Sequence, residues 1–412
     1  MQKGILVNQT YISARPTGIS RVAFSLIEEM VKRNGKLLYL STKGDLFEIK
    51  PNDIVPFLKN RIFPELRETK FKKYQLIRSL TTKVLVADLV LNAISMFFDY
   101  IIMKKNEKIL IPFLIPIENY MGSILLTEPI INRSIFSAFT RYLQRNEKVQ
   151  TCMICHDIIA LRNPNWFTNL AKNKNNLVCS NYLKIDRIIC ISNYTYQTLV
   201  EYFGMNDNFI RKTQVVIPLG SPLPSKFGNN QMEKVKKSQI NVVYVSAINP
   251  RKNHVLVAEV LSKIANAQNP ICLRLIAGDS WGEKEILNKL EQTVNNHFQY
   301  HIDKRVSEDE LILSYQESDF SIYLSLEEGF GLPVLESLSQ GCPVVCSNTS
   351  SLQEFSNLPG VLTVDPKNPK QIQQILTELV TKAEYRNNLK NEIDSNAVRS
   401  LKDFAKDVLD YV

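Results

Sequence analysis

Several features of secreted, disordered and membrane-spanning proteins are missing from this sequence. No window is of low enough complexity to indicate disorder, and the apolar and charged fractions, 44% and 22%, are those of a soluble globular protein. The start, MQKGILVNQTYIS, carries too short an apolar run for a secretory signal, so we expect a first strand there. Seven cysteines, an odd number scattered through apolar segments, favour reduced thiols and a cytoplasmic protein.

Metal-binding patterns are also missing. No Asp-x-Asp follows a predicted strand, and His254, His297 and His301 do not cluster with carboxylates. Cys152-x-x-Cys155 has the spacing of half a zinc or redox motif, but no second pair follows at zinc spacing and both residues lie inside an apolar strand. We therefore expect neither a metal nor another cofactor.

The order of apolar segments predicts two domains. The 412 residues are too many for one ordinary core. Short apolar runs alternate with amphipathic helical patterns, which is typical of parallel sheets with crossover helices. The alternation stops in GSPLPSKFGNNQMEKVKKSQ, a linker composition, and then restarts as a six-stranded doubly wound pattern. We predict Rossmann-like α/β domains at 1–220 and 240–394, a linker at 221–239, and a helix within 395–412 that packs back on the first domain.

The formal net charge of +9 is unevenly distributed. Residues 57–109 hold eleven Lys or Arg against five Asp or Glu, around the apolar stretch VLVADLVLNAISMFFDYIIM. Asp88 and Asp99 oppose a membrane span, because a carboxylate near the bilayer centre costs about 2.5 kcal/mol or more. Two interpretations stay open: a basic surface on an anionic membrane face, or a core helix with a solvated basic face. Nucleic acid is not expected, since aromatic residues do not interleave with the basic ones.

The most informative stretch is SLEEGFGLPVLE, from Ser325 to Glu336. FSIYLS predicts a strand that leads into it, and PVLESLSQG predicts a helix after it. The loop therefore lies at the carboxyl end of a strand, where doubly wound sheets bind ligands. Free amides and the dipole at the helix start suit a phosphate, and glycines let the backbone approach it. The donor-binding positions expected in this loop are Gly329, Phe330, Gly331, Leu332, Pro333 and Val334.

The two glutamates of this stretch need separate functions, because a carboxylate aimed at the phosphate would repel it. Glu336, one turn inside the helix, can accept hydrogen bonds from a ribose diol. Glu328 can meet a sugar hydroxyl or a developing positive charge. Arg251 and Lys252 follow the first strand of the second domain and can neutralise a diphosphate. These residues predict a site for a nucleoside-diphosphate sugar; the alternative is a tight turn with a surface basic pair.

Two of these motifs resemble a known family. Glu328-Gly-Phe-Gly-Leu-Pro-x-x-Glu336 resembles the E-x7-E motif of retaining GT-B glycosyltransferases, in particular glycosyltransferase family four, also called group 1. VVYVSAINPRKNHVLVAEVL resembles the start of that family's donor domain, with Arg251 and Lys252 as its basic pair. The resemblance implies an α/β GT-B fold, with two Rossmann-like domains facing a central cleft, and cations that assist departure of the nucleotide.

The resemblance varies along the chain. It is specific over about 241–366, moderate over 149–220 and nearly absent over 36–143. The form Asn-Pro-Arg-Lys-Asn-His is similar to that of bacterial mannosyl- and rhamnosyltransferases. Ser246-Ala247 departs from the Gly-Arg of many members, which leaves the sugar and the base open.

Further candidate positions lie outside these motifs. His156 closes the strand in VQTCMICHD, where a family histidine contacts the donor sugar; a structural, hydrogen-bonded histidine is the alternative. We expect Asp157 to brace the adjacent loop. Gly18 either lets a backbone amide approach the β-phosphate or the acceptor, or forms a tight turn. Arg305 and Val306 lie at an edge that contacts the nucleobase in the family.

We expect a transferase that moves a hexosyl group from a nucleoside-diphosphate sugar to a hydroxyl acceptor. The acceptor would be a glycan or lipid-linked glycan in surface polysaccharide synthesis, and the resemblance implies retention of configuration. Glu328, His156, Arg251 and Lys252 are the expected catalytic residues, with no metal. Two alternatives remain: a non-catalytic GT-B partner subunit, and a nucleotide-sugar epimerase of GT-B fold.

Overall fold

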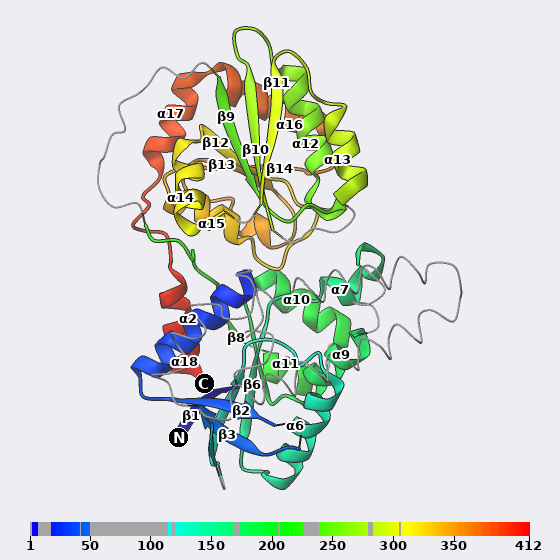
Figure 1. Cartoon of the computed structure of the whole chain (residues 1–412), viewed down its shortest axis with the longest axis vertical. Coiled ribbons are helices and arrows are strands. Elements are labelled where there is room, and N and C mark those ends of the chain that lie inside the picture. Colours follow the sequence, from blue (N-terminus) through cyan, green and yellow to red (C-terminus); the bar gives the residue numbers. More distant parts are fainter. Residues whose placement is uncertain are drawn as a thin grey trace.

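The protein consists of two α/β domains, one above the other in Figure 1. The computed structural model describes residues 2–6, 18–41, 43–49, 114–117, 120–167, 174–204, 207–213, 215–225, 239–278, 283–304 and 306–412. The basic stretch 57–109, for which a membrane surface and a core helix both stayed open, and Arg305, expected at a nucleobase contact, lie outside these residues. No helix within the described residues is long and apolar enough to cross a bilayer.

The first domain is built on an eight-stranded sheet with the order β4-β3-β2-β1-β5-β6-β7-β8. Six of its strands are parallel neighbours, and β3 is antiparallel to both β2 and β4. The strands are β1 (Gln2–Leu6), β2 (Lys36–Leu40), β3 (Leu46–Ile49), β4 (Leu114–Pro116), β5 (Gly122–Leu126), β6 (Gln150–Cys155), β7 (Arg187–Cys190) and β8 (Val215–Val216).

The antiparallel β3 corrects the expectation of a purely parallel first sheet. Only five residues connect β2 to β3, which is too short for a crossover and makes a hairpin instead. Gly44 takes the left-handed conformation in this turn, with φ of +96°, and Ser41 Oγ accepts a hydrogen bond from the Asp45 amide at 3.1 Å.

Helices cover both faces of the first sheet. Asn132 caps α6 by accepting hydrogen bonds from the amides of Ser134 and Ile135, and Ser192 caps α10 through the Thr195 amide. The helices are α2 (Gly18–Lys32), α6 (Arg133–Arg145), α7 (Ile159–Arg162), the 3-10 turn η2 (Pro164–Trp166), α9 (Asn175–Lys184), α10 (Asn193–Phe203) and α11 (Asp207–Thr213).

The second domain has the predicted six-stranded parallel sheet, in the order β11-β10-β9-β12-β13-β14. The strand order reverses between β9 and β12, so the carboxyl ends of these two strands form the switch point at which such sheets bind ligands. The strands are β9 (Ile240–Val245), β10 (Ile271–Ala277), β11 (Phe298–Lys304), β12 (Phe320–Tyr323), β13 (Val344–Ser347) and β14 (Val361–Val364).

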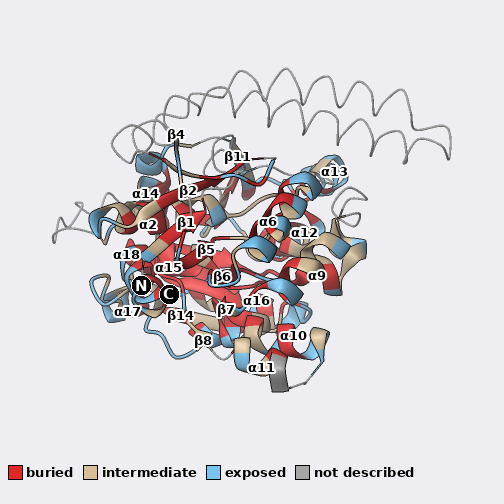
Figure 2. Ribbon diagram, turned by 90° about the horizontal axis from the view of Figure 1, so that it is seen from below, coloured by how far each residue is buried: buried red, intermediate tan, exposed pale blue. Residues whose placement is uncertain are grey.

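The second sheet is covered by helices whose apolar faces complete the core. Figure 2 shows the buried residues gathered on the strands of both domains and the exposed residues on the outer faces of the helices. The elements are η3 (Pro250–Lys252), α12 (His254–Ile264), α13 (Glu283–Glu291), α14 (Glu308–Glu317), α15 (Leu332–Ser339), η4 (Ser350–Phe355), α16 (Pro369–Thr381) and α17 (Ala383–Glu392).

The chain passes between the domains twice, and the two passages lie side by side. Ser221 pairs with Ser400 in a parallel bridge, with hydrogen bonds from the Ser221 amide to Arg399 O at 2.7 Å and from the Leu401 amide to Ser221 O at 3.0 Å. The returning segment ends in α18 (Leu401–Tyr411), which packs against α2 of the first domain (Figure 1).

Candidate active site

The loop between β12 and α15 is in contact with both domains. Gly331 precedes α15 with a φ of +119°, in the left-handed region that favours glycine. A Cβ on Gly329 would lie 2.1 Å from the carbonyl oxygen of His156, so the loop backbone meets the first domain here. The Gly329 carbonyl also accepts hydrogen bonds from the hydroxyls of Ser192 at 2.7 Å and Thr195 at 2.9 Å. Glycine at 329 is therefore required by the approach of the two domains.

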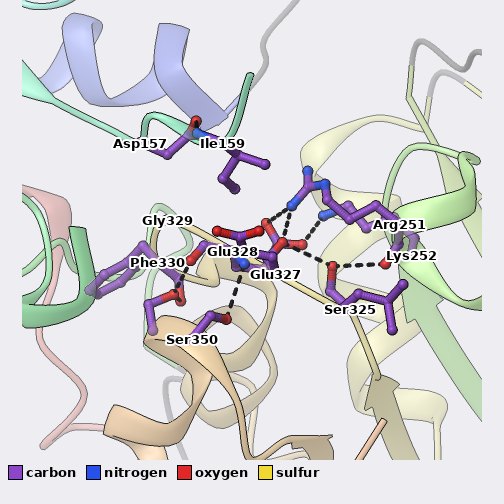
Figure 3. A network of polar contacts seen from close by, with 12 residues as sticks. Asp157, Ile159, Arg251, Lys252, Ser325, Glu327, Glu328, Gly329, Phe330 and Ser350 are labelled. Atoms are coloured by element: carbon purple, nitrogen blue, oxygen red, sulfur yellow. Dashed lines mark hydrogen bonds and ion pairs between the residues drawn. The ribbon is translucent and has the colours of Figure 1, made fainter. Parts of the chain in front are cut away.

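Glu328 lies against the predicted pair of cations. Arg251 Nη1 is 2.9 Å from Glu328 Oε2, and the Lys252 ammonium contacts Oε1 of the same carboxylate. Lys252 Nζ also donates to the hydroxyl of Tyr323 at 2.7 Å. Figure 3 shows both cations reaching this carboxylate from one side of the loop. The three charged side chains come from the ends of β9 and β12, so the switch point brings them together.

Burial and neighbouring charge set the protonation of this cluster. Burial opposes the charge of Glu328, but the cations of Lys252 and Arg251 outweigh it and lower the pKa of this carboxyl to about 2. Burial also lowers the pKa of Lys252 to about 8, although Glu328 acts in the opposite direction. At neutral pH the cluster therefore holds two cations and one carboxylate at an edge of the sheet suited to a diphosphate.

Glu336 is buried within α15, and residues of both domains contact it. Tyr315 donates a hydrogen bond from its hydroxyl to Glu336 Oε2 at 3.0 Å. Arg21 Nη1, from α2 of the first domain, is 3.7 Å from Oε1 and also pairs with Glu308 at 3.9 Å. Burial raises the pKa of Glu336, while Arg21 and Tyr315 act to lower it. The carboxylate predicted to accept from a ribose diol thus lies at the contact between domains.

Arg21 was missed in the sequence, although one signal was present. It comes three residues after Gly18, within the first turn of the helix that the glycine begins. Its partners lie about three hundred positions further along the chain, so no local pattern connects them. Gly18 itself is the first residue of α2.

His156 follows β6 and is held by the first domain. Its Nε2 is 2.8 Å from the carbonyl oxygen of Thr127, and burial lowers its pKa. Nε2 therefore carries the proton and donates it to that carbonyl. Asp157 Oδ1 accepts from the Ile159 amide at 3.0 Å, which braces the loop. His156 thus has the hydrogen bond of a structural histidine, and its carbonyl lies against the Gly329 backbone of the loop.

Several predicted donor-binding side chains point into the core. Phe330 packs edge-on against Phe355 with ring centroids 5.3 Å apart, and Val334 is fully buried. The Val334 amide donates to the Gly331 carbonyl at 3.0 Å, so it is used within the turn. Leu332 and Val306 pack against the hydrophobic clusters of the second domain, and Pro333 is in the first turn of α15. The buried side chains of Phe330 and Val334 therefore leave only their backbone for a ligand, while Leu332, Pro333 and Val306 are partly exposed.

The cysteine pair has the surroundings of core residues. Cys152 and Cys155 lie three positions apart on β6 and so face opposite sides of the sheet, in separate hydrophobic clusters. Burial raises the pKa of both thiols, to about 12 for Cys152. Within the described residues, no three His, Cys, Asp or Glu side chains are grouped so that they could hold a metal ion.

Comparison with known protein families finds a match for the second domain. The family described as Glycosyl transferases group 1 matches residues 228–395. The second domain is a group 1 glycosyltransferase domain. The group 1 domain includes Arg251, Lys252, Glu328 and Glu336, so the family resemblance predicted from these motifs is confirmed.

Two curated relatives of the chain come from Escherichia coli. The serotype-specific mannosyltransferase WbdA is 20% identical over 217 residues, which are 50% of this chain and 27% of that protein. O-antigen chain mannosyltransferase B is 32% identical over 127 residues, which are 30% of this chain and 32% of that protein. The chain thus spans less than a third of the length of each relative.

Solved structures share the two-domain arrangement. Anabaena Alr3699/HepE in complex with UDP and glucose is similar over 100% of this chain and 99% of that chain, with a TM-score of 0.62 and 13% identity. Sucrose-phosphate synthase of Thermosynechococcus elongatus is similar over 100% and 98%, with a TM-score of 0.63 and 13% identity. The predicted GT-B fold is confirmed.

Proposed function

We propose that this protein transfers a hexosyl group from a nucleoside-diphosphate sugar to a hydroxyl of a glycan or lipid-linked glycan. The observation that carries the proposal is the cluster of Arg251, Lys252 and Glu328 at the switch point of a group 1 domain. The mannosyltransferase relatives support a place in surface polysaccharide synthesis and favour mannose among the hexoses.

The proposed chemistry begins with the charge of the leaving group. Cleavage of the bond between sugar and phosphate leaves negative charge on the nucleoside diphosphate. Arg251 can bind this charge with a bidentate fork and Lys252 can bind it as a point charge. A diphosphate that takes these contacts shares the cations with Glu328, whose carboxylate is then available to a sugar hydroxyl or to a developing oxocarbenium ion.

The remaining residues orient the donor in this proposal. Glu336 accepts from the ribose hydroxyls, with Tyr315 and Arg21 fixing its two oxygens. His156 keeps its proton on Nε2 toward Thr127 O, so it offers the sugar a neutral imidazole face.

We propose a retaining, front-face reaction, in which a phosphate oxygen of the departing diphosphate removes the proton of the acceptor hydroxyl. The acceptor oxygen attacks C1 on the face that the diphosphate leaves, and the proton ends on the diphosphate. No metal enters this scheme because the two cations supply the positive charge. We further propose that the protein works in the cytoplasm, at the inner face of the membrane if its acceptor is lipid-linked.

The first test is thermal unfolding with GDP, UDP, dTDP, CDP and ADP, with Glu336→Ala as the control variant. A diphosphate at a hundred times its dissociation constant adds about 2.7 kcal/mol to the free energy of unfolding, which raises the melting temperature by a few degrees. We expect one diphosphate to do so in the wild type and to lose its effect in the variant. The corresponding nucleotide sugar is then used in transfer assays.

The outcomes of the transfer assay separate the alternatives. A glycosylated acceptor supports the proposal, and the anomeric configuration of the product decides between retention and inversion. A changed nucleotide sugar without acceptor would indicate an epimerase. Binding without turnover of any acceptor would indicate a partner subunit. No shift with any diphosphate would contradict the donor site itself.

A further inference from the structure

Glu327, the residue before the motif glutamate, is bound by the opposite domain. Its carboxylate accepts hydrogen bonds from Arg162 Nη1 at 2.9 Å, Asn163 Nδ2 at 2.7 Å and the Tyr194 hydroxyl at 2.6 Å. All three donors belong to the first domain, and the Glu327 side chain is only 9% exposed. A carboxylate this deeply buried is stable only with such partners, so its place depends on the docked first domain.

A second carboxylate of the group 1 domain meets the same part of the first domain. Glu354, on η4, accepts hydrogen bonds from the backbone amides of Asn193 at 3.2 Å and Tyr194 at 2.9 Å. These amides begin α10, where the helix dipole favours negative charge. Together with Ser192 and Thr195, which bind the Gly329 carbonyl, they make the start of α10 the docking surface for both the β12–α15 loop and η4 (Figure 1).

The backbone of Glu327 connects this docking surface to the predicted phosphate site. The Glu327 carbonyl accepts a hydrogen bond from the Arg251 guanidinium. Arg251 in turn binds Glu328, and its own carbonyl accepts from the Leu326 amide at 2.9 Å. One residue therefore has its side chain fixed by the first domain and its carbonyl bound to a cation of the second.

We propose that Glu327 is a positioning residue that sets Arg251 and Glu328 for transfer when the first domain docks. The inference rests on the proposed function, because it states the arrangement of the domains in which Arg251 and Glu328 are placed for that reaction. Docking through Arg162, Asn163 and Tyr194 holds the loop. Undocking takes these three donors from the Glu327 carboxylate, so that the loop whose Glu327 carbonyl binds the Arg251 guanidinium is held by the second domain alone. Sugar transfer is thereby limited to the docked arrangement, in which the contact between domains excludes water from C1.

The test uses the full chain with Glu327→Gln, Arg162→Met and Arg162→Lys. Arg274→Met is the matched control: Arg274 pairs with Asp303 at 2.5 Å, is 35% exposed against 33% for Arg162, and lies on β10 of the group 1 domain with its partner on the neighbouring β11. Four quantities are measured: the radius of gyration by small-angle scattering, the dissociation constant of the diphosphate that raises the melting temperature, kcat, and the share of donor hydrolysed instead of transferred.

We expect Glu327→Gln and Arg162→Met to lower kcat by about 10- to 100-fold, to raise the hydrolysed share and to increase the radius of gyration. The dissociation constant of the diphosphate should change less than kcat, because in the proposed function Lys252, Glu336 and the start of α15 bind the nucleotide without a contact to Glu327. Arg162→Lys should restore part of kcat, and the control should match the wild type.

Two results would overturn the proposal. The first is a kcat and a hydrolysed share within about twofold of the wild type in both variants. The second is a fall in melting temperature that accounts for all lost activity, with no change in the hydrolysed share. A wild type that binds no diphosphate and transfers no sugar would overturn the proposed function instead, and scattering of the variants would still report whether Glu327 docks the domains.

Discussion

At the scale of single residues, burial and neighbouring charges have opposite effects on the pKa values of the site. Lys252 is nearly buried, and burial lowers its pKa to about 8, below the value of 10.5 for an exposed lysine. The folded protein therefore loses this proton before the unfolded chain does as the pH rises. Between about pH 8 and 10.5, the folded state binds fewer protons at Lys252 than the unfolded chain, so the free energy of unfolding rises with pH. The same deprotonation removes a cation from the site.

This opposition predicts the pH dependence of the reaction. We expect kcat/KM to fall above about pH 8, while the contribution of Lys252 to the free energy of unfolding rises. In Lys252→Arg the fall should move to higher pH, because a guanidinium keeps its proton throughout. pH–rate profiles of both proteins test this. An alkaline limb at the same pH in both would assign the titration to another group.

Two residues of the site had no local signal that would identify them. Glu327 stands beside Glu328, which already satisfies the motif, and its partners are 133 to 165 positions away in the chain. Arg21 faces Glu336 from the other domain. The proximity of Arg251 and Lys252 to Glu328 could be predicted because the loops that follow neighbouring strands of a parallel sheet meet at one edge. Contacts between domains depend on the tertiary structure, and no short segment of the sequence predicts them.

At the scale of elements, the β12–α15 loop depends on the absence of a side chain at position 329. In Gly329→Ala, the Cβ would lie 2.1 Å from His156 O and 2.7 Å from Asp157 Cβ. We expect the loop and the first domain to separate and kcat/KM to fall by about 10- to 100-fold, with little loss of melting temperature. Steady-state kinetics and thermal unfolding measure both effects.

Gly278→Ala is the control for this substitution, because a Cβ there has no heavy atom within 4 Å outside its neighbours. It should leave kcat/KM near the wild-type value. A Gly329→Ala protein with wild-type kinetics would show that the loop can shift without harm and would contradict the role of the close approach.

The strands differed in how well the sequence predicted them. The second sheet was predicted because short apolar runs such as those of β9, β12 and β13 alternate with helical patterns, as in a parallel sheet covered by helices. We predicted no strand at β5 (Gly122–Leu126), although all five of its residues are buried, because the run GSILL is short and begins with Gly and Ser. β3 was missed because its half-buried Phe47 and Glu48 interrupt the apolar run.

At the scale of the whole molecule, α18 follows the second domain in the chain but contributes to the core of the first domain. Phe404, Val408 and Leu409 are completely buried where α18 packs on α2, and Arg33 pairs with Asp410 at 2.6 Å. Phe404→Ala should lower the free energy of unfolding by about 3–5 kcal/mol through the lost contacts and the cavity. Hydrogen exchange should rise in α2 and α18 but not in α12.

Lys406→Ala is the control on the same helix, since Lys406 is exposed. Its exchange pattern should match the wild type. If Phe404→Ala accelerated exchange in the second domain and spared α2, the assignment of α18 to the first domain's stability would be wrong.

The return of α18 also sets an order of events during synthesis. The segment that covers α2 follows the entire second domain in the chain, so the second domain leaves the ribosome complete while the first still lacks a helix. The apolar face of α2 is then exposed in the nascent chain for the time that about two hundred residues take to be made, roughly 10 to 40 s at 5–20 residues per second. Of the two domains, the first is made earlier but is finished later, because α18 follows the second domain.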